Sequence, residues 1–149
     1  MRFLKTFAKV LGVLVALFLL MQLVPYGRTH SNPPTTEEPT WDSPRTRELA
    51  KRACFDCHSN ETRWPWYANV APMSWVVEMD VNNARHIVNF SEWDKSYPLA
   101  AWCGNSVRNG GMPIGKYKLA HPEANLTPDE TADLARGLDA TIGPAVAPK

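Results

Sequence analysis

The sequence is poor in the residues that build metal clusters and disulfide frameworks. It has three cysteines in 149 residues, and no second C-x-x-C and no H-x-x-x-H accompany the C-x-x-C formed by Cys54 and Cys57. A tetrahedral zinc site takes four such ligands, and Cys103 alone does not complete one. Cysteines this close together seldom serve as a structural disulfide. The C-x-x-C therefore calls for a different chemistry.

The chain also lacks a strong charge of either sign. Its formal net charge is +1, with 16 Lys and Arg against 15 Asp and Glu. Three of the basic residues, Arg2, Lys5 and Lys9, precede an apolar run, so the chain from Pro25 onward is slightly acidic. Because no basic patch appears, the sequence gives no sign of a nucleic-acid partner. It also identifies no small-molecule substrate.

The C-x-x-C is followed directly by His58, which completes a C-x-x-C-H motif. This spacing is typical of c-type haem attachment, in which two thiols bind the haem vinyl groups and the histidine binds the iron. A redox dithiol would follow a strand in a βαβ unit, whereas the residues before Cys54 have helical periodicity. We therefore predict one covalent haem held by Cys54, Cys57 and His58, with an acceptor, usually a backbone carbonyl, on His58 Nδ1.

The amino terminus has the pattern of an export signal. Its basic start is followed by an apolar segment, residues 10–24, in which Gln22 is the one polar interruption. No A-x-A-like cleavage site follows, and about 19 mostly apolar residues from Thr6 are marginally enough to span a bilayer. We predict that residues 1–24 are an uncleaved signal anchor and transmembrane helix. The rest of the chain would lie on the outer side of the membrane, where haem attachment is completed.

The remaining chain is predicted to be a Pro-rich linker at 25–40, a helical haem domain at 41–142 and a flexible tail at 143–149. A solvated His30 is expected in the linker. Helices are predicted from Pro44 to the motif, from Trp75 to about Phe90, weakly over 97–108 and from Thr131 to about Ile142. The first and last should cross beside the haem. The fold class is therefore all-α and cytochrome c-like.

Residues 64–73 combine several aromatic rings with two prolines, so this segment is predicted to be a loop. Its rings would wrap the haem edge or fill the core. The carbonyls near Pro65 and Pro72 are candidate acceptors for His58 Nδ1. In the following helix, Met79 lies on the stripe predicted to be buried and is expected to pack rather than bind iron.

Met112 is the predicted sixth iron ligand. Two glycines precede it and Pro113 follows, and such a stiff loop presents a thioether where a helix would bury it in packing. The alternatives are that Met112 merely covers the haem, or that His121 binds the iron instead. Cys103 has no internal partner once the other two cysteines bind haem, so we expect a buried thiol rather than an intermolecular link.

Several longer words in the sequence resemble the haem-binding domain family of exported bacterial proteins, whose members carry a single C-x-x-C-H. These words are ACFDCHSNETRWPWYANVAPMSW, NARHIVNFSEWD, GGMP and HPEANLTPDE. The resemblance implies a monohaem domain tethered to the bacterial inner membrane on its periplasmic side, with Met112 as axial partner of His58. The family often has a second proline and aromatic residues after that methionine, where this chain has residues 114–117, IGKY.

Three functions are consistent with this reading. Two protein ligands leave the iron no open position, which favours single-electron transfer to an unidentified redox partner over enzyme activity. A sensing or catalytic haem would need a labile sixth ligand. A subunit of a larger membrane redox complex would use the anchor and Cys103 for assembly.

Covalent attachment is the first testable prediction. Because thioether bonds survive denaturation, acid acetone should leave haem on protein produced with the maturation machinery. Replacing both Cys54 and Cys57 with Ala should leave no haem on the denatured chain. Extraction of the haem from the unchanged protein would contradict the prediction.

Overall fold

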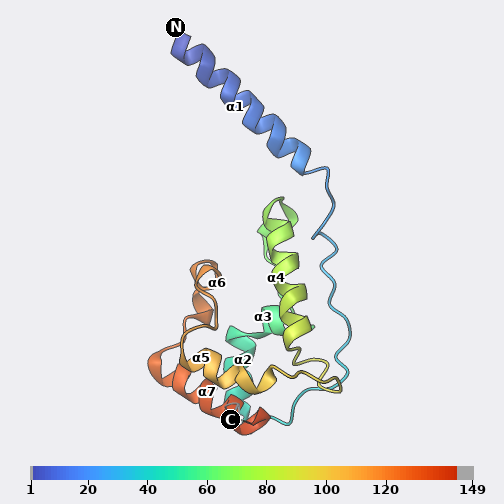
Figure 1. Cartoon of the computed structure of the whole chain (residues 1–149), viewed down its shortest axis with the longest axis vertical. Helices are drawn as coiled ribbons and strands as arrows, with labels where there is room; N and C mark the ends of the chain where they lie inside the picture. Colours follow the sequence, from blue (N-terminus) through green and yellow to red (C-terminus); the bar gives the residue numbers. More distant parts are fainter. Residues whose placement is uncertain (1, 144–149) are drawn as a thin grey trace. The chain divides into compact units, whose positions relative to one another are not determined.

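The structure, a computed structural model, describes residues 2–143 and is helical (Figure 1). Within these residues no strand forms, and one isolated β-bridge pairs Glu37 with Glu92. The prediction of an all-helical chain is confirmed. The helices are α1 (Arg2–Met21), α2 (Pro44–Ala53), α3 (Phe55–His58), α4 (Met73–Ile87), α5 (Cys103–Arg108), α6 (Gly115–Ala120), α7 (Pro128–Ile142) and the 3-10 helices η1 (Trp66–Asn69), η2 (Ala100–Trp102) and η3 (Pro122–Ala124).

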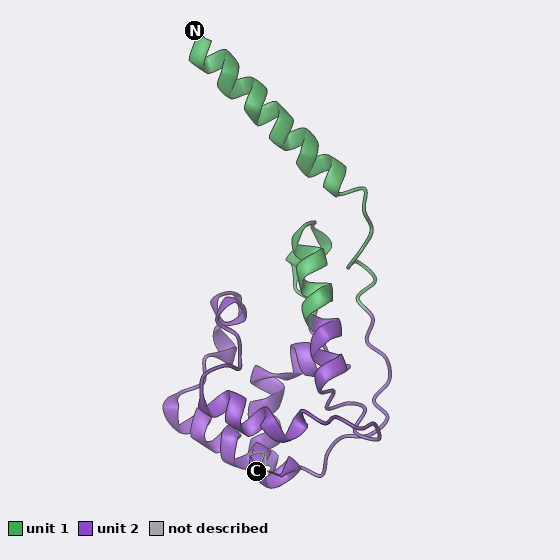
Figure 2. Ribbon diagram, viewed as in Figure 1, with its two compact units in different colours: residues 1–30, 64–80 green, residues 31–63, 81–149 purple. Residues whose placement is uncertain are grey.

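The chain divides into two compact units, drawn in different colours in Figure 2. Unit 1 consists of residues 1–30 and 64–80, and unit 2 of residues 31–63 and 81–149. Helix α4 begins in unit 1 and ends in unit 2. This division was not foreseen from the sequence, which predicted a single domain over residues 41–142.

Helix α1 of unit 1 has the length and composition of a membrane-crossing helix, which signal sequences share. None of its residues is buried against the rest of the protein. An apolar helix is therefore present where the anchor was predicted, and it ends at Met21, before the predicted boundary at residue 24.

The core of unit 2 is built where α7 packs against α2 and α5. Helix α2 begins as predicted, with Ser43 accepting a bond from the Thr46 amide and Pro44 in the first turn. Helix α7 has the predicted capping box between Thr127 and Glu130. Both caps satisfy amides that a helix start leaves without partners. The largest fully buried side chains here are Leu49, Phe55, Leu134 and Leu138.

Helices α2 and α7 approach most closely where Gly137 faces Thr46. A Cβ built on Gly137 would lie 1.9 Å from Thr46 Oγ1 and 2.6 Å from its Cγ2. Thr46 is itself buried and bonded to Ser43 at the start of α2, so it has little room to move. The contact therefore requires glycine at 137.

The second half of the predicted linker, residues 31–40, is bonded to unit 2 rather than free. The Glu37 amide donates to Ser91 O at 3.3 Å, and the Trp93 amide donates to Glu37 O at 2.9 Å. These bonds form the isolated bridge. An extended, proline-rich segment leaves its backbone groups available to another extended segment, which is why its composition alone suggested a free tether.

His30 is the second correction, because it was expected to be solvated. Its ring stacks on Trp64 with centroids 4.7 Å apart, and its Nε2 lies 3.1 Å from Ala68 O, all within unit 1. The aromatic segment that it contacts does not fill a core throughout, since Trp66 is 79% exposed.

Helix α4 buries a different face from the one predicted. The predicted buried stripe includes Met79, Asn83 and Ile87, but Met79 is 50% exposed, Ile87 is 47% exposed, and Asn83 is also exposed. Val81 and Ala84 are buried instead. The predicted and the observed set of residues both have helical spacing. The observed set, Val81 and Ala84, has the smaller side chains and is buried within unit 2. Met79 is therefore not a packing residue here.

The segment after Met112 contains α6 and η3, where the sequence predicted no helix. At the carboxyl terminus, Gly143 follows α7 with φ +95°. The rest of the predicted flexible tail, residues 144–149, lies outside the described residues.

The close approach of α2 and α7 generates a stability prediction. Gly137→Ala should lower the free energy of unfolding by about 1–3 kcal/mol, because the added methyl group overlaps Thr46. Urea unfolding followed by circular dichroism measures the change. Gly115→Ala is the control, since nothing lies within 4 Å of a Cβ at that position. Equal stability of the two variants would contradict the predicted overlap.

Candidate functional site

The C-x-x-C-H motif lies at a break between two helices of unit 2. Helix α2 ends at Ala53, Cys54 leaves helical geometry with φ −126°, and α3 contains the rest of the motif. The amides of Cys57 and His58 both donate to Cys54 O, at 3.1 and 2.9 Å. Phe55, between the cysteines, is 1% exposed and belongs to the core. The motif is thus one tight turn anchored by its own phenyl ring.

The His58 ring is oriented by the end of α4. Its Nδ1 lies 3.0 Å from Val88 O, and the Phe90 amide donates to His58 O at 2.8 Å. A carbonyl has no hydrogen to donate, so Nδ1 carries the proton and Nε2 is the lone-pair nitrogen. Burial lowers the pKa of His58, which favours the neutral ring that a metal requires.

The acceptor differs from the two candidates given by the sequence. Those were the carbonyls near Pro65 and Pro72, whereas the structure uses Val88, thirty residues after the histidine. Helix α4 ends at Ile87, so the Val88 carbonyl follows the last turn and is available to a side chain. The helix end, which sequence patterns place only approximately, was needed to identify it.

The surroundings of Cys54 and Cys103 favour the protonated thiol over the thiolate. Burial, with smaller contributions from the neighbouring Cys103 and Cys57, raises the pKa of Cys54 to about 12. Burial raises the pKa of Cys103 to about 11. A redox dithiol depends on a lowered thiol pKa, so this environment argues against that alternative. All three cysteines are present as thiols, and Cys103 packs against the same core as Cys54.

Asp56, between the two cysteines, is a buried carboxylate held from two directions. It is 7% exposed. The Arg63 backbone amide donates to its Oδ1 at 3.0 Å, and the Arg63 guanidinium contacts both oxygens at 3.3 Å. From α6, the Tyr117 hydroxyl donates to Oδ2 at 2.7 Å. A buried carboxylate needs such partners, because an unpaired one would be strongly destabilising.

Tyr117 connects this carboxylate to the segment that follows Met112. Its ring stacks on His121 with centroids 4.1 Å apart and an interplanar angle of 11°. His121 Nδ1 lies 3.3 Å from Glu123, whose carboxylate lies 3.5 Å from the Arg63 guanidinium. These contacts close a circuit of five side chains, which we call the motif ring: Asp56, Tyr117, His121, Glu123 and Arg63.

The two candidate sixth ligands, His121 and Met112, lie in different surroundings. The His121 side chain is 13% exposed and is engaged with Tyr117 and Glu123. Met112 is 39% exposed, and its amide donates to Ser106 O of α5 at 3.1 Å. The Met112 segment is therefore fixed to α5 at one end and, through Tyr117, to the motif at the other.

Sequence reasoning missed Asp56, Arg63, Tyr117 and Val88 as parts of the site. Asp56 carried a signal, since a charged residue inside a C-x-x-C next to a core phenylalanine needs a partner. Tyr117 is an aromatic residue in the segment after Met112, where the resemblance led us to look for aromatics. Arg63 and Val88 carried no signal, because their roles depend on where the backbone passes.

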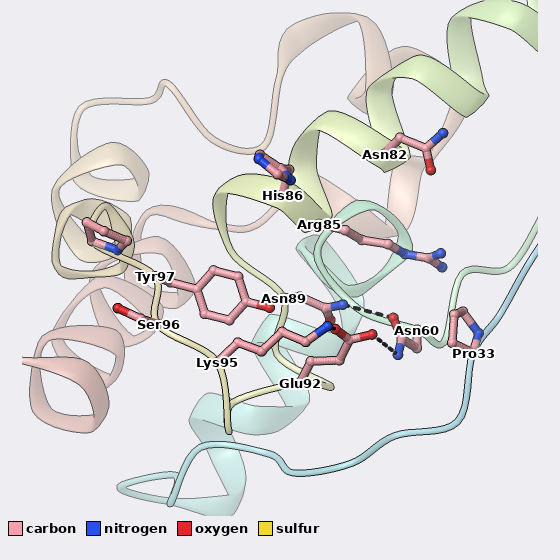
Figure 3. A pocket seen from close by; sticks show the side chains of 11 residues that line it. Pro33, Asn60, Asn82, Arg85, His86, Asn89, Glu92, Lys95, Ser96 and Tyr97 are labelled. Atoms are coloured by element: carbon pink, nitrogen blue, oxygen red, sulfur yellow. Dashed lines mark hydrogen bonds and ion pairs between the residues drawn. The ribbon is translucent and has the colours of Figure 1, made fainter.

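A second feature of unit 2 is a polar groove of about 580 Å³ beside α4 (Figure 3). Asn60 bonds Asn89 and Glu92 on its wall, and Glu92 also pairs with Lys95. Arg85, which also lines the groove, donates to four oxygens, those of Ser31 O, Asn32 Oδ1, Ser59 O and Thr62 Oγ1. These polar groups are hydrogen-bonded to one another, and the bonds of Arg85 connect residues 31 and 32 to α4.

The residues present fit a covalently attached haem better than a bare metal ion. Across residues 2–143, no group of three or more His, Cys, Asp or Glu side chains is placed to hold a metal. A haem needs only two thiols and one neutral imidazole from the motif, together with apolar side chains against the porphyrin. Exposed large apolar side chains of unit 2 are Ile87, Leu99, Trp102, Met112 and Leu119.

Comparison with known proteins gives one match. The model of a family described as a haem-binding domain matches residues 16–140, which is most of the chain. No curated protein and no solved structure matches it.

The bond between Tyr117 and Asp56 leads to a testable prediction. A hydrogen bond to a carboxylate contributes about 1.5–3 kcal/mol, so Tyr117→Phe should speed exchange of the α6 amide hydrogens roughly tenfold or more. Hydrogen exchange read by mass spectrometry measures this effect. Tyr97→Phe removes a hydroxyl outside the motif ring and should leave α6 unchanged. If both variants protect α6 as the unchanged protein does, the motif ring does not stabilise that helix.

Proposed function

Because the chain belongs to the haem-binding domain family, we propose that it holds one haem covalently through Cys54 and Cys57, with His58 binding the iron. The observation that carries this proposal is the bond from His58 Nδ1 to Val88 O. It fixes the tautomer and the ring orientation, and so directs the lone pair of Nε2 to a metal. In this proposal, the tight turn of the motif would present both thiols and the imidazole to the same haem.

We propose Met112 as the sixth ligand. His121 is already engaged with Tyr117 and Glu123, whereas the Met112 side chain is partly exposed. The bond from the Met112 amide to Ser106 O holds one end of the loop, and the bond from Tyr117 to Asp56 in the motif ring holds the other. The Met112 thioether therefore lies on a fixed loop and is not packed within a helix. A cytochrome c-like fold, in which α2 and α7 cross beside the haem, is part of this proposal.

If His58 and Met112 both held the iron, a bound haem would supply one-electron chemistry, and no iron position would remain for a substrate. We therefore propose electron transfer rather than enzyme activity. His58 would hold the iron through Nε2, its proton would stay on Nδ1 and remain hydrogen-bonded to Val88 O, and the buried face of the motif would keep water from the thioether side. The electron would pass to a redox protein or to a larger membrane complex.

A labile sixth ligand is the second candidate, and the 39% exposure of Met112 favours it. Solvent access to a thioether would permit its replacement by an external ligand, as a sensing or catalytic haem requires. The two candidates differ in whether the unchanged protein binds CO.

We propose that residues 1–24 anchor the protein in the bacterial inner membrane, with the haem on the periplasmic side. Arg2, Lys5 and Lys9 precede or open the apolar run of α1, and basic residues favour the cytoplasmic side. No residue of this apolar helix is buried against the protein, which supports a lipid environment for it.

The sixth ligand is tested by Met112→Ala. Haem should stay attached, because the thioether bonds and His58 are unchanged, but the iron should bind CO stoichiometrically. The charge-transfer band of ferric methionine ligation should disappear. The potential should fall by on the order of 0.1 V, within the roughly 0.8 V range that axial ligands control.

His121→Ala is the matched control and should do none of this. CO binding by the unchanged protein would support the labile-ligand candidate. CO binding by the His121 variant alone would identify the histidine as the ligand and leave Met112 as packing.

A further inference from the structure

The aromatic segment of unit 1, residues 64–72, has an exposed tryptophan that the haem site does not explain. We call it the tryptophan loop. Its Trp66 is 79% exposed, although a tryptophan is usually largely buried. The segment from 64 to 77 contains no Asp, Glu, Lys or Arg, so the stretch of chain that carries this ring has no formal charge.

The tryptophan loop is bonded directly to the end of α1. The Gln22 side-chain amide donates to Ala71 O at 2.9 Å, and its oxygen accepts from the Ala71 amide at 3.0 Å. Arg28 donates to the same Gln22 oxygen at 3.0 Å. A side-chain amide that pairs with both backbone groups of one residue fixes orientation as well as distance.

Two further contacts hold the chain after α1 against this region. His30 stacks on Trp64 and contacts Ala68 O. Gly27, with φ +77°, lies so close that a Cβ on it would be 2.2 Å from Ser74 O. The polar Gln22 interrupts the apolar run at the point where its side chain bonds the backbone of the tryptophan loop.

The position of Gln22 sets the depth of the tryptophan loop in a membrane. Helix α1 has 20 residues, which at about 1.5 Å per residue spans about 30 Å, the thickness of the hydrocarbon layer. Gln22 directly follows it and so lies at the boundary with the headgroups. Trp66 is five residues from Ala71, a separation of roughly 10 Å at 3-10 helix rise, comparable with the headgroup layer.

We propose that the tryptophan loop is a second membrane contact, in which Trp66 inserts into the headgroup layer beside α1. Tryptophan suits this layer, because its ring is apolar and its N–H can bond to a polar group. Exposed apolar neighbours within unit 1, namely Leu23, Val24, Tyr26 and Met73, extend the surface. This inference rests on the proposed anchor, and its partner is the lipid bilayer itself.

The test uses the full chain with its haem, reduced to the low-spin ferrous state, in lipid nanodiscs and labelled with 5-fluorotryptophan. The resonance missing from Trp66→Phe is assigned to Trp66. A phosphatidylcholine carrying a nitroxide on its headgroup should broaden this resonance at least several-fold more than that of Trp102. Trp102→Phe assigns the control, an exposed ring of unit 2.

Gln22→Leu keeps α1 apolar and removes both bonds to Ala71, so broadening of the Trp66 resonance should fall. Unchanged broadening in this variant would overturn the role of Gln22. The proposal is overturned if a water-soluble gadolinium chelate, and not the nitroxide lipid, broadens the Trp66 resonance. Protein that elutes without nanodiscs would instead contradict the anchor, which separates the two failures.

Discussion

The bond between His58 Nδ1 and Val88 O is the interaction on which the site depends. A helix leaves its last carbonyls without partners, and here one carbonyl just beyond α4 is satisfied by the ring that the motif presents. The Phe90 amide returns a bond to His58 O, so the two segments hold each other. A neutral imidazole with its lone pair on Nε2 follows from this pairing.

The motif ring performs the corresponding task for the segment that carries Met112. A buried carboxylate is expensive unless paired, and Asp56 is paired by one residue from its own side of the site and one from α6. Arg63 neutralises this charge, and the Tyr117 hydroxyl ties α6 to the same carboxylate by a hydrogen bond. Attachment and axial ligation would be coupled through Asp56, although neither chemistry uses its carboxylate.

In unit 1, polar groups at the end of an apolar helix make the contacts to the tryptophan loop. Gln22 interrupts the apolar run and binds the backbone of the tryptophan loop instead of solvent. His30 and Gly27 strengthen the same connection. The aromatic residues, which in the sequence suggested packing around a cofactor, have a surface that suits the boundary of a bilayer.

The sequence by itself determined the features that depend on local spacing: the C-x-x-C-H turn, the caps at Ser43 and Thr127, the apolar first helix and the all-helical class. It did not decide which row of α4 is buried, because the rows of Met79 and Val81 have the same period. It also missed Val88 and Tyr117 as partners, and α6 as a helix. These depend on which backbone and side-chain groups meet across 30 to 60 residues of chain, and only the tertiary structure brings those groups within hydrogen-bonding distance.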